Sequence, residues 1–282
     1  MTATVARLAN GRLHLREGPI DLILHAEGLG ADTAEHAAIA AFDRLLARLV
    51  TELPILRQPI GDSAPTVDHP VSKRMVTAAW PHRGVFVTPM AAVAGAVADH
   101  ILAVMVAAAP SLTKAWVNDG GDIALHLTGD AIFEVGLIPR LDAPALAGTA
   151  MVRASDPVRG VATSGRGGRS LSMGIADAVT VLARSAAEAD VAATLIANAV
   201  DLPGHPAITR GPANTEDPDS DLAGRPVVLA VGTLTADEVE HALARGADVA
   251  RRMQTTGLIH GAALSLGGRW RIVGVSTAGL IF

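Results

Sequence analysis

The chain has 282 residues and no cysteine, carries a formal net charge of −5, and is 50% hydrophobic. A chain of this length and hydrophobicity buries a substantial core, which excludes a disordered protein, and the lack of cysteine excludes disulfides, thiolate zinc sites and cysteine nucleophiles. The negative charge and an aromatic content of only 2% argue against nucleic-acid binding, which needs basic side chains in excess and aromatic surfaces for stacking.

The first part of the chain predicts a strand, a long helix and a loop. Residues 20–25 are typical of a short strand, and Asp32 or Thr33 caps a helix that runs to about Leu53 with its apolar side chains on one face. Prolines end this helix. Residues 54–72 are therefore expected to form a loop or linker, and this is where a subdivision of the chain is expected.

The longest apolar run, from Met90 to Ala109, predicts a buried alanine-rich helix. Its centre carries Asp99 and His100, and an aspartate in the middle of a bilayer costs about 2.5–3.5 kcal/mol. A helix in a protein core is therefore favoured over one that spans a membrane. The first eighteen residues contain no apolar segment of the kind found in secretory signals. We expect a cytoplasmic protein with no membrane and no nucleic acid among its partners.

The remaining sequence predicts strands in hairpin-like runs, separated by a few long helices. Residues 203–226 are rich in Pro, Gly, Asp and Asn, which indicates a long and mobile surface loop, and Thr235 with Glu238 forms a capping box. No strand–helix–strand rhythm is sustained, so we expect one domain, residues 1–282, with an α+β fold of mainly antiparallel sheets and flanking helices. The expected strands lie at about 116–118, 122–127, 132–138, 148–154, 177–183, 227–231, 261–266 and 270–275, and the expected helices at about 186–200 and 235–257.

A strand-to-strand turn is the first candidate binding feature. It consists of Asn118, Asp119, Gly120, Gly121 and Asp122. The two glycines let backbone N–H groups approach a ligand closely, and the polar side chains offer hydrogen bonds. The alternative is a tight hairpin turn with no ligand.

A glycine-rich basic segment is the second candidate. Thr163, Ser164, Gly165, Arg166 and Arg169 combine hydroxyl groups, a flexible backbone and two guanidinium groups. Arginine offers a fork of donors that matches phosphate oxygens, so the segment suits a diphosphate group. The alternative is a flexible basic loop.

A pair of oxygen-bearing side chains on a predicted helix is the third candidate. Asp190 and Thr194 lie four residues apart, so their oxygens face the same way and can hold a hard cation such as Mg²⁺ together. Such pairs are common on helices that bind nothing. The spacing alone therefore does not decide between a metal site and a pair of side chains with no ligand.

In this order, the three features resemble the FAD:protein FMN transferase (ApbE) family. The resemblance is strongest over residues 84–200, and an uncharacterised ApbE-like branch is closer than the transferases themselves. No single motif is diagnostic, but the ordered set is fairly specific. The matching segments are VNDGGDI at 117–123, FEVGLIP at 133–139, ATSG at 162–165, AVTV at 178–181 and ADVAAT at 189–194, with TPMAAVAGAVAD at 88–99 and SMGIADAVTV at 172–181 typical of that branch.

The resemblance implies an ApbE-type α+β fold with a cleft for a flavin dinucleotide. In the transferases, the Asp and Thr of the last motif, here Asp190 and Thr194, bind Mg²⁺, which activates the diphosphate of FAD. FMN then passes to a threonine of a partner protein. The implied cofactors are therefore Mg²⁺ and FAD or FMN, and the implied partners are a flavin-like ligand and an acceptor protein.

Two departures from the transferases affect the expected chemistry. Residues 91–96 lack the lysine and the aromatic of the transferase segment GGxAKGY, and residues 170–177 read SLSMGIAD where the transferases have SHIIDP. Asp177 is the nearest carboxylate that can replace the missing base, and the alternative role for it is a capping or turn residue. The candidate functions are a flavin-binding protein with transfer activity, a non-catalytic binding module, and an enzyme that uses the cleft for another phosphate-containing substrate. A homodimer is compatible with each of them.

Overall fold

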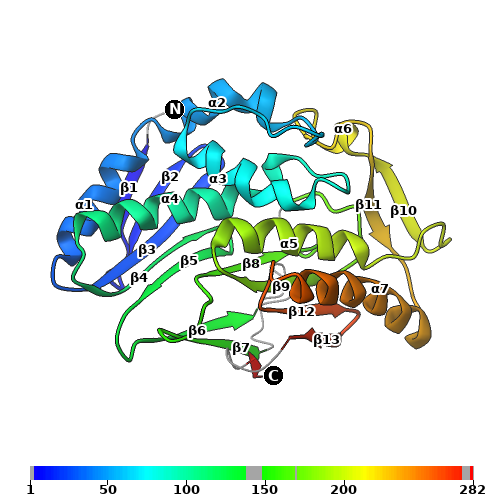
Figure 1. Ribbon diagram of the computed structural model, residues 1–282. Helices are drawn as coiled ribbons and strands as arrows, with labels where there is room; N and C mark the ends of the chain where they lie inside the picture. The colour runs from blue at the N-terminus through cyan, green and yellow to red at the C-terminus, as the bar shows by residue number, and fades with distance from the viewer. Residues whose placement is uncertain (1–2, 138–147, 169, 275–279, 282) are drawn as a thin grey trace. The chain divides into compact units, whose positions relative to one another are not determined.

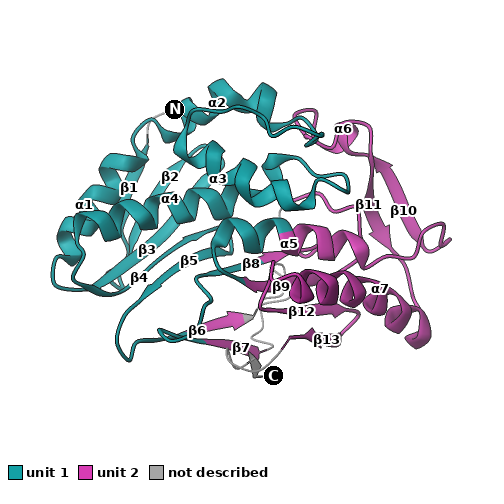
Figure 2. Cartoon of the chain, in the orientation of Figure 1, with its two compact units in different colours: residues 1–133, 152–162, 183–191 teal, residues 134–151, 163–182, 192–282 magenta. Residues whose placement is uncertain are grey.

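The computed structural model describes residues 3–137, 148–168, 170–274 and 280–281. These residues form two compact units, shown in Figure 2. Unit 1 consists of residues 1–133, 152–162 and 183–191, and unit 2 consists of residues 134–151, 163–182 and 192–282. Each unit is discontinuous in sequence. The assignment of the whole chain to one domain stays a prediction.

An antiparallel sheet forms the base of unit 1 (Figure 1). Its strands pair in the order β1-β2-β3-β4-β5, and β5 then pairs with the first residues of β8. Alternate side chains of β2 and β3, among them Leu15, Leu22 and Leu24, are fully buried, because successive residues of a strand point to opposite faces. The strands are β1 (Thr4–Arg7), β2 (Leu13–Glu17), β3 (Ile20–Gly28), β4 (Leu112–Asp119), β5 (Asp122–Leu127) and β8 (Gly160–Ser164).

Helices cover one face of this sheet, and the apolar run identified in the sequence is the central one. The helix α4 packs against β4, β5 and α1, and its buried residues include Ile101 and Met105. Within the described residues, the segment Pro89–Ala108 is long and apolar enough to cross a membrane by composition. In unit 1 it is a core helix. The helices are α1 (Ala31–Phe42), α2 (Leu45–Leu56), α3 (Pro70–Ala79), η1 (Trp80–His82), η2 (Pro89–Ala92), α4 (Val93–Ala108) and the start of α5 (Ala186–Ala199).

The N-terminal helix differs from its prediction in three ways. It begins at Ala31 after Gly30, so Asp32 and Thr33 lie inside its first turn and neither is its cap. It is divided into α1 and α2, because Arg44 takes a left-handed conformation with φ of 59°, which an α-helix cannot continue through. Pro54 lies inside the last turn of α2 and does not end it. Residues 54–72, expected as a loop or linker, lie within unit 1 and contain the end of α2 and the start of α3.

Unit 2 contains antiparallel β-ladders and one long helix. Strand β12 pairs with β9 and with β13, and α7 packs on β12 and β13. The predicted capping box of Thr235 and Glu238 is present at the start of α7. The elements that lie wholly or mainly in this unit are β6 (Ile132–Leu137), β7 (Gly148–Arg153), β9 (Ala178–Ala183), α5 from residue 192 onwards, β10 (Ile208–Pro212), α6 (Ala213–Glu216), β11 (Pro226–Val231), α7 (Ala236–Thr255), β12 (Gly261–Leu266), β13 (Arg269–Val273) and β14 (Leu280–Ile281).

The segment 203–226 is more ordered than its composition predicts. It contains β10 and α6, and β10 pairs with β11 to form an antiparallel hairpin. Glycine and proline in this segment fit a short strand that bears its prolines at its ends. The predicted fold class is confirmed, because the structure combines helices with a large and mostly antiparallel sheet.

Candidate functional site

Asp190 lies close enough to three other carboxylates of unit 1 for their charges to act on it, those of Asp122, Asp119 and Asp99. Asp190, on α5, accepts a hydrogen bond from the backbone N–H of Gly95, with 3.1 Å between N and Oδ2. Burial, followed by repulsion from Asp122 and, more weakly, from Asp119, raises the pKa of Asp190 well above its usual value. Protein atoms surround the Asp190 carboxyl closely, and the residue as a whole is partly exposed. The sequence predicted the turn and this helix as separate features, and the structure brings their carboxylates together.

The turn at 118–122 has the geometry of a tight β-hairpin. Gly120 and Gly121 both have positive φ, of 62° and 118°, as the two central residues of a hairpin turn require. The Asn118 side chain closes the turn by accepting the Gly121 N–H, with 2.8 Å between Oδ1 and N. Asp119 and Asp122 are paired across β4 and β5 and are both buried. The segment is therefore a tight hairpin turn, whose role in binding a ligand stays a prediction, and the same hairpin directs two carboxylates to the buried face of the sheet.

Hydroxyl groups cluster at the predicted glycine-rich segment in unit 2. The Thr163 and Thr180 hydroxyl oxygens lie 2.8 Å apart, and the Thr194 hydroxyl donates to Ser164 Oγ over 3.5 Å. Gly165 has φ of 139° and packs so tightly on the 176–178 backbone that a Cβ there would lie 2.7 Å from the carbonyl oxygen of Asp177. The sequence did not predict Thr180 as a site residue. It lies on a β-strand, and the contact of its hydroxyl with Thr163 depends on how the strands pair.

The Asp177 carboxylate links two turns of unit 2 by hydrogen bonds. Its Oδ1 accepts from the Arg166 guanidinium over 3.0 Å, and its Oδ2 accepts from the Gly267 N–H over 2.7 Å. Both carboxylate oxygens therefore hold structural hydrogen bonds, as the capping or turn interpretation expects. A general base needs an oxygen that can take up a proton, and each oxygen of Asp177 already accepts a hydrogen bond from the protein. Arg169, the second predicted arginine, lies outside the described residues.

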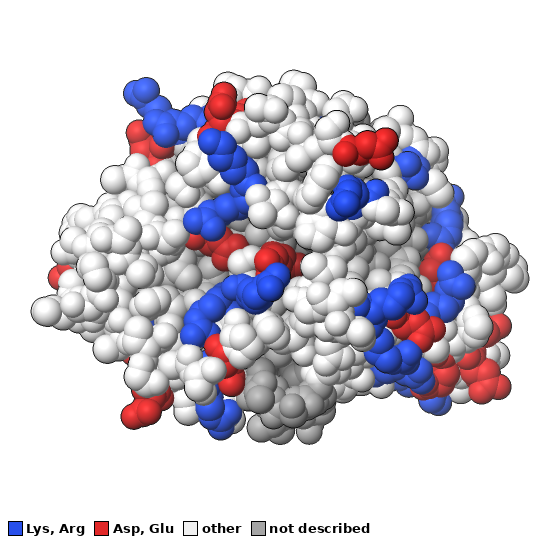
Figure 3. Space-filling view, viewed as in Figure 1, with Lys and Arg blue, Asp and Glu red and all other residues white. Residues whose placement is uncertain are grey.

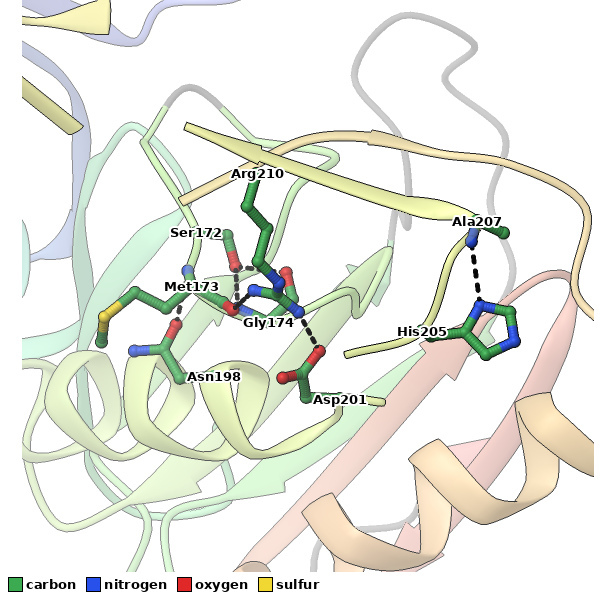
Figure 4. Close-up of polar contacts among 8 residues, drawn as sticks. All are labelled: Ser172, Met173, Gly174, Asn198, Asp201, His205, Ala207 and Arg210. Atoms are coloured by element: carbon green, nitrogen blue, oxygen red, sulfur yellow. Dashed lines mark hydrogen bonds and ion pairs between the residues drawn. The ribbon is translucent and has the colours of Figure 1, made fainter. Parts of the chain in front are cut away.

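The segment that replaces the histidine-containing segment of the transferases is held by its backbone (Figure 4). Met173 donates its N–H to Asn198 Oδ1 over 3.0 Å, and its carbonyl oxygen accepts from Arg210 Nη1 over 2.6 Å. Arg210 also forms an ion pair with Asp201. Ser172 Oγ donates to the carbonyl of Gly174 over 3.0 Å. These contacts attach the β10–β11 hairpin to the segment, and Figure 4 shows the Met173 side chain directed away from the arginine.

The predicted site residues fall in both units. Asn118 to Asp122 and Asp190 belong to unit 1, whereas Thr163 to Arg166, Asp177 and Thr194 belong to unit 2. The helix α5 contains the boundary, so Asp190 and Thr194 lie one turn apart on a continuous helix. Among the described residues, no group of three or more His, Cys, Asp or Glu side chains has the geometry to hold a metal ion by itself.

Comparison with known proteins identifies the class of fold. The crystal structure of the ApbE protein of Thermotoga maritima aligns with a TM-score of 0.51 at 12% identity, covering 95% of this chain and 96% of that one. A UPF0280 protein of Methanoregula boonei is 36% identical over 178 residues, which cover 60% of this chain and 71% of the relative. A UPF0280 protein of Methanosphaerula palustris is 34% identical over 183 residues, 64% of this chain and 73% of the relative.

The fold is therefore that of an ApbE-like protein. The family model described as "AbpE bacteria" matches residues 5–272, nearly the whole chain. The chain belongs to this family, and the predicted resemblance is confirmed.

Proposed function

We propose that this protein binds Mg²⁺ together with a flavin or another diphosphate-bearing ligand. The observation that carries the proposal is the placement of Asp190, which lies one turn before Thr194 on α5 and close enough to Asp122 for the two charges to repel each other. A divalent cation neutralises this repulsion between the carboxylates.

The donor set fits magnesium rather than a softer metal. Asp190 offers a carboxylate oxygen and Thr194 offers a hydroxyl oxygen, and Mg²⁺ prefers oxygen ligands and usually keeps few protein ligands alongside water and phosphate. The Gly95 N–H donates to Oδ2 of this carboxylate, so its bond engages one of the two oxygens. When bound, the ion would neutralise charge on the bridging oxygens of a diphosphate.

The ligand-binding residues of the proposal are those that the sequence singled out. The turn at 118–122 offers backbone N–H groups, and Thr163, Ser164 and Arg166 offer hydroxyl and guanidinium donors for phosphate oxygens. On the face shown in Figure 3, Lys and Arg side chains form separate groups beside acidic ones. On this face the basic side chains therefore form no broad continuous surface, and the proposal relies on a few local donors.

A transfer activity requires more of this chain than binding does. In flavin transfer, the threonine oxygen of an acceptor protein attacks the FMN phosphorus of FAD, AMP leaves, and a base takes the hydroxyl proton. Asp177 is the candidate base, and both of its oxygens are held by Arg166 and Gly267. This observation favours the second candidate function, a binding module without transfer. A third candidate, a reaction on another phosphate-containing substrate, uses the same binding residues.

Ligand screening by thermal shift tests the proposal and separates its forms. FAD, FMN and ADP are each added with and without Mg²⁺. We expect a rise in melting temperature that requires both ligand and Mg²⁺ in the wild type and is lost in Asp190→Ala. Release of AMP from FAD, with covalent fluorescence on an added acceptor domain, would establish transferase activity, and binding without release would establish the module. The absence of any Mg²⁺-dependent shift would refute the proposal.

The cytoplasmic location and the homodimer stay predictions. Fractionation of cells tests the first, and sedimentation of the purified chain tests the second.

A further inference from the structure

Two helices of unit 1, α4 and α5, supply hydrogen-bond acceptors to each other's N-termini. The two oxygens of Asp99, on α4, accept the N–H groups of Ala186 and Ala187, the first two residues of α5, over 3.0 Å and 2.9 Å. The first N–H groups of a helix have no partner within the helix, and a carboxylate satisfies them and interacts favourably with the helix dipole. Asp99 is therefore an N-terminal cap that comes from another helix.

The reverse contact links α5 to the start of α4. Gly95 is the third residue of α4, and its N–H is therefore one of the unpaired donors of the first turn. The residue before α4, Ala92, provides no side-chain cap. Asp190 supplies the missing acceptor from α5. Each helix thus caps the other with an aspartate.

Close backbone contact between α4 and α5 links the two caps to each other. A Cβ on Gly95 would lie 2.3 Å from the carbonyl oxygen of Ala186, so α4 and α5 approach more closely here than any other residue type allows. Gly95 and Asp99 are one turn apart on α4, and Ala186 and Asp190 are one turn apart on α5. The pair of contacts therefore fixes both the translation and the rotation of the first turn of α5.

We propose that Asp99 is a positioning residue for Asp190, which it holds in the orientation that binds Mg²⁺. The inference rests on the proposed function. Magnesium demands nearly ideal octahedral geometry at about 2.0–2.1 Å, so a small rotation of α5 is enough to misplace the Asp190 oxygen. Loss of a partner that orients a metal ligand typically lowers metal affinity by about 10–100-fold.

A matched control separates positioning from simple stabilisation of the helix. Ser185 caps the same end of α5 locally, because its Oγ accepts the N–H of Glu188 over 3.2 Å. Ser185→Ala therefore weakens the same helix terminus without removing the connection to α4. Asp99→Asn is a second variant, which keeps one acceptor oxygen and the shape of the side chain if Asp99→Ala does not fold.

The experiment measures Mg²⁺ affinity by calorimetry on the full chain. We expect Asp99→Ala, or Asp99→Asn in its place, to lower the affinity about tenfold or more, and Ser185→Ala to change it less than about twofold. Equal affinities of the Asp99 and Ser185 variants would overturn the inference. Asp190→Ala should bind no Mg²⁺ and serves as the reference for complete loss.

A second readout needs no metal and keeps the two proposals separable. Hydrogen exchange at the Gly95 amide reports on its bond to Asp190. We expect this amide to exchange about tenfold faster in the Asp99 variant than in Ser185→Ala. If the wild type binds no Mg²⁺, the proposed function fails, and unchanged Gly95 exchange in the Asp99 variant would then overturn the positioning of Asp190 as well.

Discussion

Replacement of Gly95 by alanine should destabilise unit 1 strongly, although alanine is the better helix former. The added Cβ would lie 2.3 Å from the Ala186 carbonyl oxygen, and that neighbour is backbone that cannot rotate away. The helices must separate, which costs about 1–3 kcal/mol in a packed interior. Separation also breaks the hydrogen bond from Gly95 to the Asp190 side chain, and an intramolecular hydrogen bond contributes about 0.5–1.5 kcal/mol.

The gain in helix propensity offsets about 1 kcal/mol of this loss. We therefore expect Gly95→Ala to lower the free energy of unfolding by about 1–3 kcal/mol, measured by urea denaturation followed by circular dichroism. Gly61→Ala is the control, because a Cβ at Gly61 meets no atom within 4 Å. It should be neutral or slightly stabilising, since alanine restricts the unfolded chain. A Gly95→Ala protein as stable as the wild type would show that the close contact of α4 and α5 does not exist.

Further variants test other contacts. Burial, followed by the charges of His69 and Arg74, lowers the pKa of His100 from 6.5 to about 4. The imidazole is therefore neutral in the folded state, and the free energy of unfolding should fall as the pH drops from about 6.5 towards 4. His100→Gln should reduce that loss, measured by denaturation curves at several pH values. Arg210→Ala removes a largely buried ion pair and should cost about 1–3 kcal/mol of unfolding free energy. The exposed pair of Arg251 is its control, and Arg251→Ala should cost less than about 1 kcal/mol in the same assay. Thr235→Ala removes the capping box of α7 and should lower the stability by about 1 kcal/mol, and an unchanged urea midpoint would contradict this role.

Local patterns in the sequence predicted much of the fold. The capping box of Thr235, the turn glycines Gly120 and Gly121, and the apolar run of α4 each depend on residues close together in the chain, and each is present in the structure. The break at Arg44 was not predictable in this way. Arginine has no preference for a left-handed conformation, so nothing in the local sequence marks Arg44 as the break between α1 and α2.

The candidate site was predicted less completely than the fold. The spacing of Asp190 and Thr194 placed both on one helix, as α5 shows. The influence of Asp119 and Asp122 on Asp190 was not predictable, because about seventy residues separate the turn from the helix. The position of Asp99 in the sequence indicated a buried contact without naming its partner. A charged residue in the middle of an apolar helix indicates a buried partner, and the sequence does not say that the partner is the start of α5.

The attachment of the β10–β11 hairpin has a consequence for local unfolding. Polar contacts secure its base, through the bonds of Arg210 and the bond from Val228 N–H to the Ser172 carbonyl, and much of β11 is exposed, including Leu229 at 45%. A segment with few buried apolar contacts opens at a lower free energy than the core. The hairpin should therefore form its own cooperative unit, with amides that exchange through a sub-global opening. A protease would cut first within residues 213–225, while the sheet of unit 1 stays folded.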